Sequence, residues 1–264
     1  MVKRSLFIFA TVLTLCSCEV IDENARFLPL PEAGQTRTHV LLEYTGFRCV
    51  NCPAAAETAS ALKDIYGERL IVVALHPASN PFTQGKYDYT CPAADTCYQF
   101  MGGTATTPFP TGNIDLLPDE GSYFIDPAEW ASRINHLMAD SVAPIIKTVE
   151  AEYISASREI HVSCSVPAIS HACRLAVWLT EDSVAGTQAM PDGIVNTAYY
   201  HRHLLRATAF DSPWGTALAQ NSASAVIAMP EGCNIRKCSL VVLLLDANDY
   251  HILNGYETKM DYIE

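Results

Sequence analysis

The fold is decided by the stretch from His39 to Pro53, which reads HVLLEYTGFRCVNCP. Its first part is apolar and predicts a buried β-strand over residues 38–44, and the alanine-rich run from Pro53 to Tyr66 predicts a helix. Proline is tolerated in the first turn of a helix, which fits Pro53. A Cys-x-x-Cys pair, Cys49 and Cys52, therefore stands between a strand and a helix.

The position of Cys49 favours ionisation of its thiol. Backbone N–H groups at a helix start are unpaired and the helix dipole is positive there, so a thiolate is stabilised. Cys52 lies about one helical turn further on and can close a disulfide with Cys49. An isolated Cys-x-x-Cys pair has two other interpretations, a structural disulfide or one half of a zinc site.

The first residues predict export and lipid attachment. A basic pair at positions 3 and 4 precedes an apolar segment from Ser5 to Leu15, which is shorter than the about 20 residues that cross a bilayer. Residues 15–18, LCSC, look like a bacterial lipoprotein box. Cleavage before Cys18 would leave it as the lipidated N-terminus, and two or more acyl chains hold a protein stably on a membrane. The alternative is an ordinary secretory signal cut near Ser17.

Composition agrees with an exported, folded protein. The chain has 264 residues, of which 49% are hydrophobic, and a formal net charge of −12. This length predicts one large or two ordinary domains. The acidic balance argues against nucleic acid or an anionic lipid surface as a partner. The sequence contains no phosphate-binding glycine loop, metalloprotease motif or hydrolase elbow, so it predicts no cofactor.

The histidines give weaker signals. His201 and His203 flank Arg202, and on a strand both would point to one face. A two-histidine patch without a third ligand is usually structural, so we expect no metal site. His76 follows the second predicted strand, where a local hydrogen bond and an acid–base role near Cys49 are both open.

Eight cysteines remain once Cys16 leaves with the signal and Cys18 is lipidated, and an even number in an exported protein predicts disulfides. If Cys164 and Cys173 face each other in an antiparallel hairpin, the apolar residues beside them also fall on one face of the sheet. This agreement favours a Cys164–Cys173 bridge. The other local pairs would be Cys91 with Cys97 and Cys233 with Cys238.

The chain divides into two predicted halves after a signal and lipidation site at 1–18 and a flexible tether at 19–37. In the first half, residues 38–143, strand, helix and the strand from Leu70 to Leu75 imply a parallel βαβ unit. A polar, irregular insertion at 80–103 follows. A strand from Thr111 to Leu117 and a helix from Pro127 to Ala139 complete this half.

The second half, residues 144–264, contains short β-rich runs separated by turns and little visible helix. The junction is expected between Ser141 and Pro144. Such a pattern predicts an antiparallel β-sandwich in the size range of immunoglobulin-like domains.

Three features make the first half resemble the thioredoxin fold. Cys49-Val-Asn-Cys52 lies where that superfamily carries its redox pair. Glu43, six positions earlier, lies where thioredoxins carry a buried acidic residue, although a place at an exposed strand end is the alternative. Phe109-Pro110-Thr111 matches the cis-proline element of the superfamily, the alternative being an ordinary loop proline.

This resemblance implies thiol–disulfide exchange with thiols or disulfides of exported proteins. Cys49 would attack, Cys52 would resolve the mixed disulfide, and a buried Glu43 would relay a proton. The backbone at Pro110 and Thr111 would pair with the substrate chain. The dipeptide Val-Asn lacks the proline of thioredoxin, which leaves the direction of exchange open.

Most of the chain also resembles a family of Gram-negative surface lipoproteins related to a twenty-eight-kilodalton outer-membrane protein. The segments that carry this resemblance are Glu43–Pro53, Phe109–Gly112, Leu175–Asp182 and Tyr200–Arg206. It implies an outer-membrane lipoprotein with a thioredoxin-like domain, a β-sandwich and a receptor-like or adhesin-like role. A binding protein with a structural disulfide is therefore the alternative to exchange, and solvent exposure of Cys49 would separate the two. The oligomeric state stays open.

Overall fold

Two fully buried parallel strands, β1 (His39–Tyr44) and β2 (Leu70–Leu75), are joined by α1 (Cys52–Tyr66). This βαβ unit agrees with the prediction because continuous apolar runs suit strands that are covered on both faces. The structure is a computed structural model, and it describes residues 37–139, 146–167, 169 and 172–260. The predicted signal, most of the tether and the junction at 141–144 lie outside these residues.

Most of the remaining elements are strands. In chain order they are α2 (Pro92–Phe100), β3 (Thr111–Ile114), α3 (Trp130–Leu137), β4 (Thr148–Ile154), β5 (Glu159–Ser165), β6 (Cys173–Glu181), β7 (Val184–Ala189), β8 (Val195–His201), β9 (Leu204–Thr208), β10 (Thr216–Ala217), β11 (Ser222–Ala228), β12 (Cys238–Asp246) and β13 (Ile252–Lys259). None of the helices in this part of the chain is both long and apolar enough to cross a membrane.

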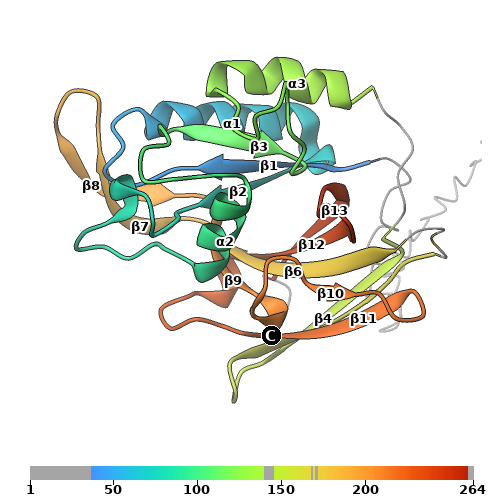
Figure 1. The fold of residues 1–264 in the computed structure, drawn as a ribbon. Helices are drawn as coiled ribbons and strands as arrows, with labels where there is room; N and C mark the ends of the chain where they lie inside the picture. The colour runs from blue at the N-terminus through green and yellow to red at the C-terminus, as the bar shows by residue number, and fades with distance from the viewer. Residues whose placement is uncertain (1–36, 140–145, 168, 170–171, 261–264) are drawn as a thin grey trace, which may run out of the picture. The chain divides into compact units, whose positions relative to one another are not determined.

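Strands from both predicted halves form one sheet of eight strands (Figure 1). Its order is β13-β12-β6-β9-β2-β1-β3, and β10 pairs with β6. The two halves join where Ala74 of β2 pairs with Leu204 of β9. A backbone bond of 2.8 Å from the Ala74 N–H to the His203 carbonyl continues this contact.

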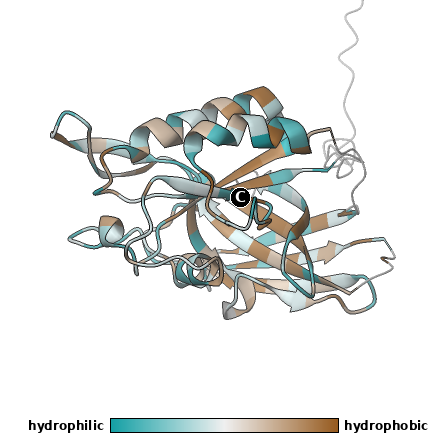
Figure 2. Cartoon of the chain, turned by 45° about the horizontal axis from the view of Figure 1, so that its top comes forward, coloured by the Kyte–Doolittle hydropathy of each residue, from teal (hydrophilic) through white to brown (hydrophobic). Residues whose placement is uncertain are grey.

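The two faces of the sheet have separate cores. On one face, α1 and α3 pack against β1 and β2 through residues that include Leu41, Ala59 and Trp130. On the other face, Val40 and Ile71 share a core with α2 and with residues of β12. Figure 2 shows the hydrophobic colouring along the central strands.

A second sheet, β11-β5-β4, packs against β6 and β12. Its strands alternate between buried residues, such as Val162 and Ile227, and exposed residues such as His161 and Val226. This alternation is expected for a sheet with one solvated face. The fold is therefore mixed α/β with two packed sheets in its second half, and the immunoglobulin-like assignment stays a prediction.

The prediction of a hairpin that pairs Cys164 with Cys173 is wrong. Cys164 in β5 pairs with Val149 and Ala223, whereas Cys173 in β6 pairs with Asp246. The two strands belong to different sheets, although each has the alternation that suggested a hairpin. Period-two patterns identify strands but do not identify their neighbours.

The region 80–103 also differs from the prediction of an irregular insertion. Its second half contains α2, which begins at Pro92 and buries Cys97 and Tyr98. Nine residues are too few for a clear helical period in the sequence.

Candidate functional site

Cys49 and Cys52 lie in the loop after β1 and at the first residue of α1, and they form a disulfide. Their Cα atoms are 5.4 Å apart. The Cys49 N–H donates to the Gly46 carbonyl, and the Cys52 N–H donates to the Cys49 carbonyl. The sulfurs are bonded to each other, which does not fit the zinc interpretation.

The disulfide is covered. Cys49 is 2% exposed and Cys52 is 1% exposed. Exposure of Cys49 was the feature expected to separate exchange from a structural role, and in this conformation the feature favours a structural role.

The loop that carries Cys49 is contacted by the hairpin formed by β7 and β8, which belongs to the second half of the chain. The Gln188 side-chain amide donates to the Cys49 carbonyl at 2.8 Å and to the Gly46 carbonyl at 3.3 Å. The Ala189 N–H donates to the Phe47 carbonyl at 2.8 Å. Gln188 was missed by the sequence reasoning, because a glutamine in a weakly patterned strand gives no signal of a contact with Cys49.

Glu43 is buried at the end of β1, which excludes an exposed strand end. Leu41, two positions earlier and so on the same face, packs against Ala55 of α1. Glu43 therefore lies on the face of β1 that α1 covers, whereas Cys49 and Cys52 share a core with Leu42 and Tyr44 of the other face. Its Oε1 has no hydrogen-bond partner among the described residues, and burial raises the pKa of Glu43 from 4.5 to about 8.

Pro110 and Thr111 lie at the same end of the sheet as Glu43. The Phe109–Pro110 peptide bond is cis, as the resemblance implied. Thr111 pairs with Tyr44 of β1, and its hydroxyl donates to the Ile125 carbonyl at 3.2 Å. The five residues expected to be catalytic thus lie on elements at the same end of β1, and the role of each stays a prediction.

A cluster of rings, three of them buried and Tyr199 half-buried, lies beside this site. His201 contacts His76, Tyr89 and Tyr199, with ring centroids 5.6, 4.6 and 4.9 Å apart. Neither ring nitrogen of His76 has a partner in the described part of the chain. Burial, followed by His201 and Arg206, lowers the pKa of His76 to about 3, and burial lowers the pKa of His201 to about 4.

His201 and His203 do not act as a pair. The His201 ring contacts the Thr187 carbonyl at 3.2 Å, whereas His203 lies beyond the end of β8 and its ring is 3.4 Å from the Asp182 carboxylate. No group of three or more His, Cys, Asp or Glu side chains suited to a metal occurs among the residues that the structure describes.

Within the described ranges, the other six cysteines are buried and unbonded, in contrast to the expected bridges. They are Cys91, Cys97, Cys164, Cys173, Cys233 and Cys238. Burial raises the pKa of each thiol, to about 12 for Cys164 and Cys238. The sulfur of Cys233 accepts a hydrogen bond of 3.0 Å from Arg206.

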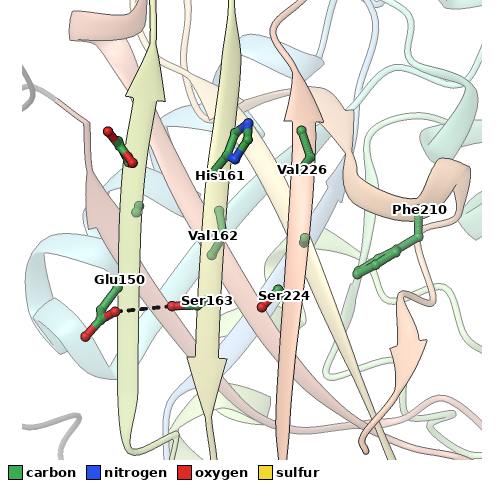
Figure 3. A pocket seen from close by; sticks show the side chains of 10 residues that line it. Glu150, His161, Val162, Ser163, Phe210, Ser224 and Val226 are labelled. Atoms are coloured by element: carbon green, nitrogen blue, oxygen red, sulfur yellow. Dashed lines mark hydrogen bonds between the residues drawn. The ribbon is translucent and has the colours of Figure 1, made fainter.

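A separate open hollow of about 610 Å³ lies over β11-β5-β4 (Figure 3). Ser163 donates to Glu150 at 3.3 Å, and His161, Val226 and Phe210 lie beside them. None of these residues belongs to the elements that hold Cys49.

No family model matches this chain, and no curated protein matches it. Among solved structures it is similar to HBP35 of Porphyromonas gingivalis, with a TM-score of 0.65 and 18% identity over 88% of this chain and 78% of that one. A crystal structure of a protein from Agrobacterium tumefaciens gives a TM-score of 0.55 and 12% identity over 88% of this chain and 98% of that one.

A domain of the outer membrane lipoprotein Omp28 from Porphyromonas gingivalis matches with a TM-score of 0.29 and 14% identity, over 44% of this chain and 95% of that domain. The two higher-scoring matches each span 88% of the chain, so they include both the half with Cys49 and the β-rich half. The chain therefore shares its fold with HBP35 and with the Agrobacterium tumefaciens protein.

Proposed function

We propose that this protein is a lipid-anchored envelope protein that exchanges disulfides with exported proteins through Cys49 and Cys52. The observation that carries the proposal is Glu43, a buried carboxyl group with an unpaired oxygen at the end of β1, the strand that leads into the Cys49 loop. Such a group costs stability, and costly ionisable groups with a shifted pKa cluster at functional sites. A purely structural disulfide does not require a buried carboxyl group such as Glu43.

The arrangement supports a balanced exchange that starts from the disulfide. A thiolate of the partner protein attacks the Cys49 sulfur, the Cys49–Cys52 bond breaks, and its electron pair leaves on the Cys52 sulfur. Glu43 is protonated at neutral pH because of its raised pKa, so it can donate a proton to that sulfur.

The second step releases the partner. A second partner thiolate attacks the partner sulfur that is bonded to Cys49, and Cys49 leaves as a thiolate next to the start of α1, where helix dipole and free N–H groups stabilise it. The partner gains a disulfide, and the Cys49–Cys52 pair is reduced by two electrons.

A surface binding protein with a structural disulfide is the second candidate. The specific observation in its favour is the burial of Cys49 and Cys52 under contacts from Gln188. A structural disulfide needs no access to another protein, whereas exchange requires that the sulfur of Cys49 be reached.

The reduction potential of the Cys49–Cys52 pair and trapping of partners test the two candidates. For exchange we expect a potential between about −120 and −270 mV, and a Cys52→Ala variant that accumulates mixed disulfides through Cys49 in cells. A Cys49→Ala/Cys52→Ala variant is the control. A potential below about −300 mV, with no adducts under conditions that trap a known oxidoreductase, would establish the second candidate.

The location is a proposal that rests on residues 1–18. The basic pair, the apolar segment and Cys18 support attachment by lipid in the cell envelope. The outer membrane is proposed because the sequence resembles the surface lipoprotein family. Labelling cells with an alkyne analogue of palmitate should mark the wild-type protein. Cys18→Ser should remove the label and release the protein from the membrane fraction, whereas Cys16→Ser should retain both. Equal labelling of the Cys18→Ser variant would contradict the proposal.

A further inference from the structure

The hairpin of β7 and β8 is attached to the main sheet only through its two ends. It leaves β6 at Glu181 and returns to β9 at Leu204, and both of those strands belong to the sheet of eight. Within the described residues, the ladder of β7 and β8 pairs with no other strand. Figure 1 shows the hairpin at the end of the sheet where α1 begins.

Three hydrogen bonds hold the hairpin on the loop that carries Cys49. Two come from the Gln188 amide and one comes from the Ala189 N–H, and all three end on main-chain carbonyls of Gly46, Phe47 and Cys49. Main-chain carbonyls can bond to water instead, so these contacts can be exchanged at small net cost.

The hairpin also contacts Tyr89. The Thr187 N–H donates to the Tyr89 hydroxyl at 3.3 Å, and the ring of His201 lies 4.6 Å from the Tyr89 ring. Gly186 is needed here, because a Cβ built on it would collide with the Tyr89 hydroxyl. The hairpin therefore fits closely on the residues that it covers.

Both ends of the hairpin carry residues that are suited to a hinge. Ser183, before β7, has φ +55°, and His203, after β8, has φ +52°. Such φ values are uncommon outside glycine, and hinge motions are absorbed by a few residues at the ends of elements. The Asp182 carboxylate accepts the His203 N–H at 2.8 Å and so links the two ends.

The outer surface of the hairpin is apolar. Ile194 is 63% exposed, Val195 is 57% exposed and Tyr200 is 58% exposed. These are among the most exposed large hydrophobic residues in the described part of the chain.

We propose that the β7–β8 hairpin is a lid that must leave the Cys49 loop before the Cys49–Cys52 disulfide can react. The proposal rests on the proposed exchange function and adds regulation to it, because the closed lid would protect the disulfide.

The test is the rate at which glutathione reduces the Cys49–Cys52 disulfide in the full-length protein. Samples are quenched with acid and alkylated, and the Cys49 and Cys52 peptides are quantified by mass spectrometry. Gln188→Ala removes two of the three hydrogen bonds, and Ala189→Pro removes the donor of the third. Both variants should be reduced faster, on the order of tenfold for Gln188→Ala, because losing hydrogen bonds shifts the opening equilibrium. Gln99→Ala, an exposed glutamine on α2, should match the wild type.

Wild-type reduction rates in both hairpin variants, with unchanged near-ultraviolet circular dichroism, would overturn the lid. Failure of the exchange function has a different signature. In that case the variants would be reduced faster by glutathione, but Cys52→Ala would trap no partner in cells even when combined with Gln188→Ala.

Discussion

Gln188 donates a hydrogen bond of 2.8 Å to the main-chain carbonyl of Cys49, although 139 positions of sequence separate the two residues. Cys49 and Cys52 lie in the first half of the chain, and the hydrogen bond to the Cys49 loop comes from the β-rich half. Access to the disulfide is therefore a property of both halves together. A thioredoxin-like motif alone does not determine whether its cysteines can be reached.

Glu43→Gln should remove a large pH dependence of stability. Glu43 ionises near pH 4.5 in the unfolded chain and near pH 8 in the folded protein, so the folded state binds more protons between these values. The free energy of unfolding of the wild type should therefore fall between pH 4.5 and pH 8, on the order of 4 kcal/mol in total. Urea titrations at pH 5 and pH 8.5 measure this fall.

The Glu43→Gln profile should differ from that of the wild type by the same amount. Glu57→Gln, on the exposed side of α1, provides the matched control and should retain the wild-type profile. Parallel profiles for Glu43→Gln and the wild type would show that the folded protein does not hold this carboxyl protonated.

His76→Phe should make the protein less sensitive to acid. The pKa of His76 is lowered to about 3 in the folded protein, so between pH 6.5 and pH 3 the unfolded chain binds the extra proton. The stabilising effect of neutral His76 is present above pH 6.5 and is lost as the pH falls. Between pH 7 and pH 5, the free energy of unfolding should fall by about 2 kcal/mol more in the wild type than in His76→Phe. An equal fall in both proteins would contradict the burial of a neutral His76.

Much of the first half could be predicted from the sequence because its signals are local. The strand over Leu70–Leu75 was predicted with its observed bounds, and the helix after Cys49 differs by one residue. Continuous apolar runs and a proline in the first helical turn determine such elements without reference to the rest of the chain.

The second half was harder to predict because its signals depend on distant contacts. β7 reads VAGTQA and β13 contains Asn254-Gly255, a pair that is typical of a turn. In the structure, Gly255 lets β13 approach β2, since a Cβ there would lie 2.8 Å from Ile71. Strand pairing and the Gln188 contact with Cys49 could not be predicted from the sequence, because they also depend on residues far apart in the chain.

Counting thiols tests the six unbonded cysteines. In denaturant without reductant, alkylation should label Cys91, Cys97, Cys164, Cys173, Cys233 and Cys238, and leave Cys49 and Cys52 unlabelled. In the native protein the same six should react slowly, because burial raises the pKa of each thiol. A Cys164–Cys173 linked peptide in the non-reduced digest would instead support the bridge expected from the sequence.

Asp115 should prove to be a major contributor to stability. Its buried carboxylate accepts hydrogen bonds from the Val40 N–H at 2.8 Å and from Arg37 at 3.1 Å, and it lies 2.6 Å from the His39 ring. Its main-chain carbonyl accepts the Ile252 N–H at 2.7 Å, which ties β13 to the end of β3. Asp115→Ala should lower the free energy of unfolding by about 3–5 kcal/mol, because the partners stay buried without the charge.

Two further variants separate the charge of Asp115 from its backbone conformation. Asp115 has φ +57°, which asparagine tolerates better than alanine does. Asp115→Asn keeps an acceptor for Val40 and should therefore lose less stability than Asp115→Ala in urea titrations. Asp64→Ala, at an exposed position of α1, should change stability by less than about 0.5 kcal/mol. If Asp115→Asn and Asp115→Ala lose equal amounts, the charge and not the left-handed backbone determines the effect.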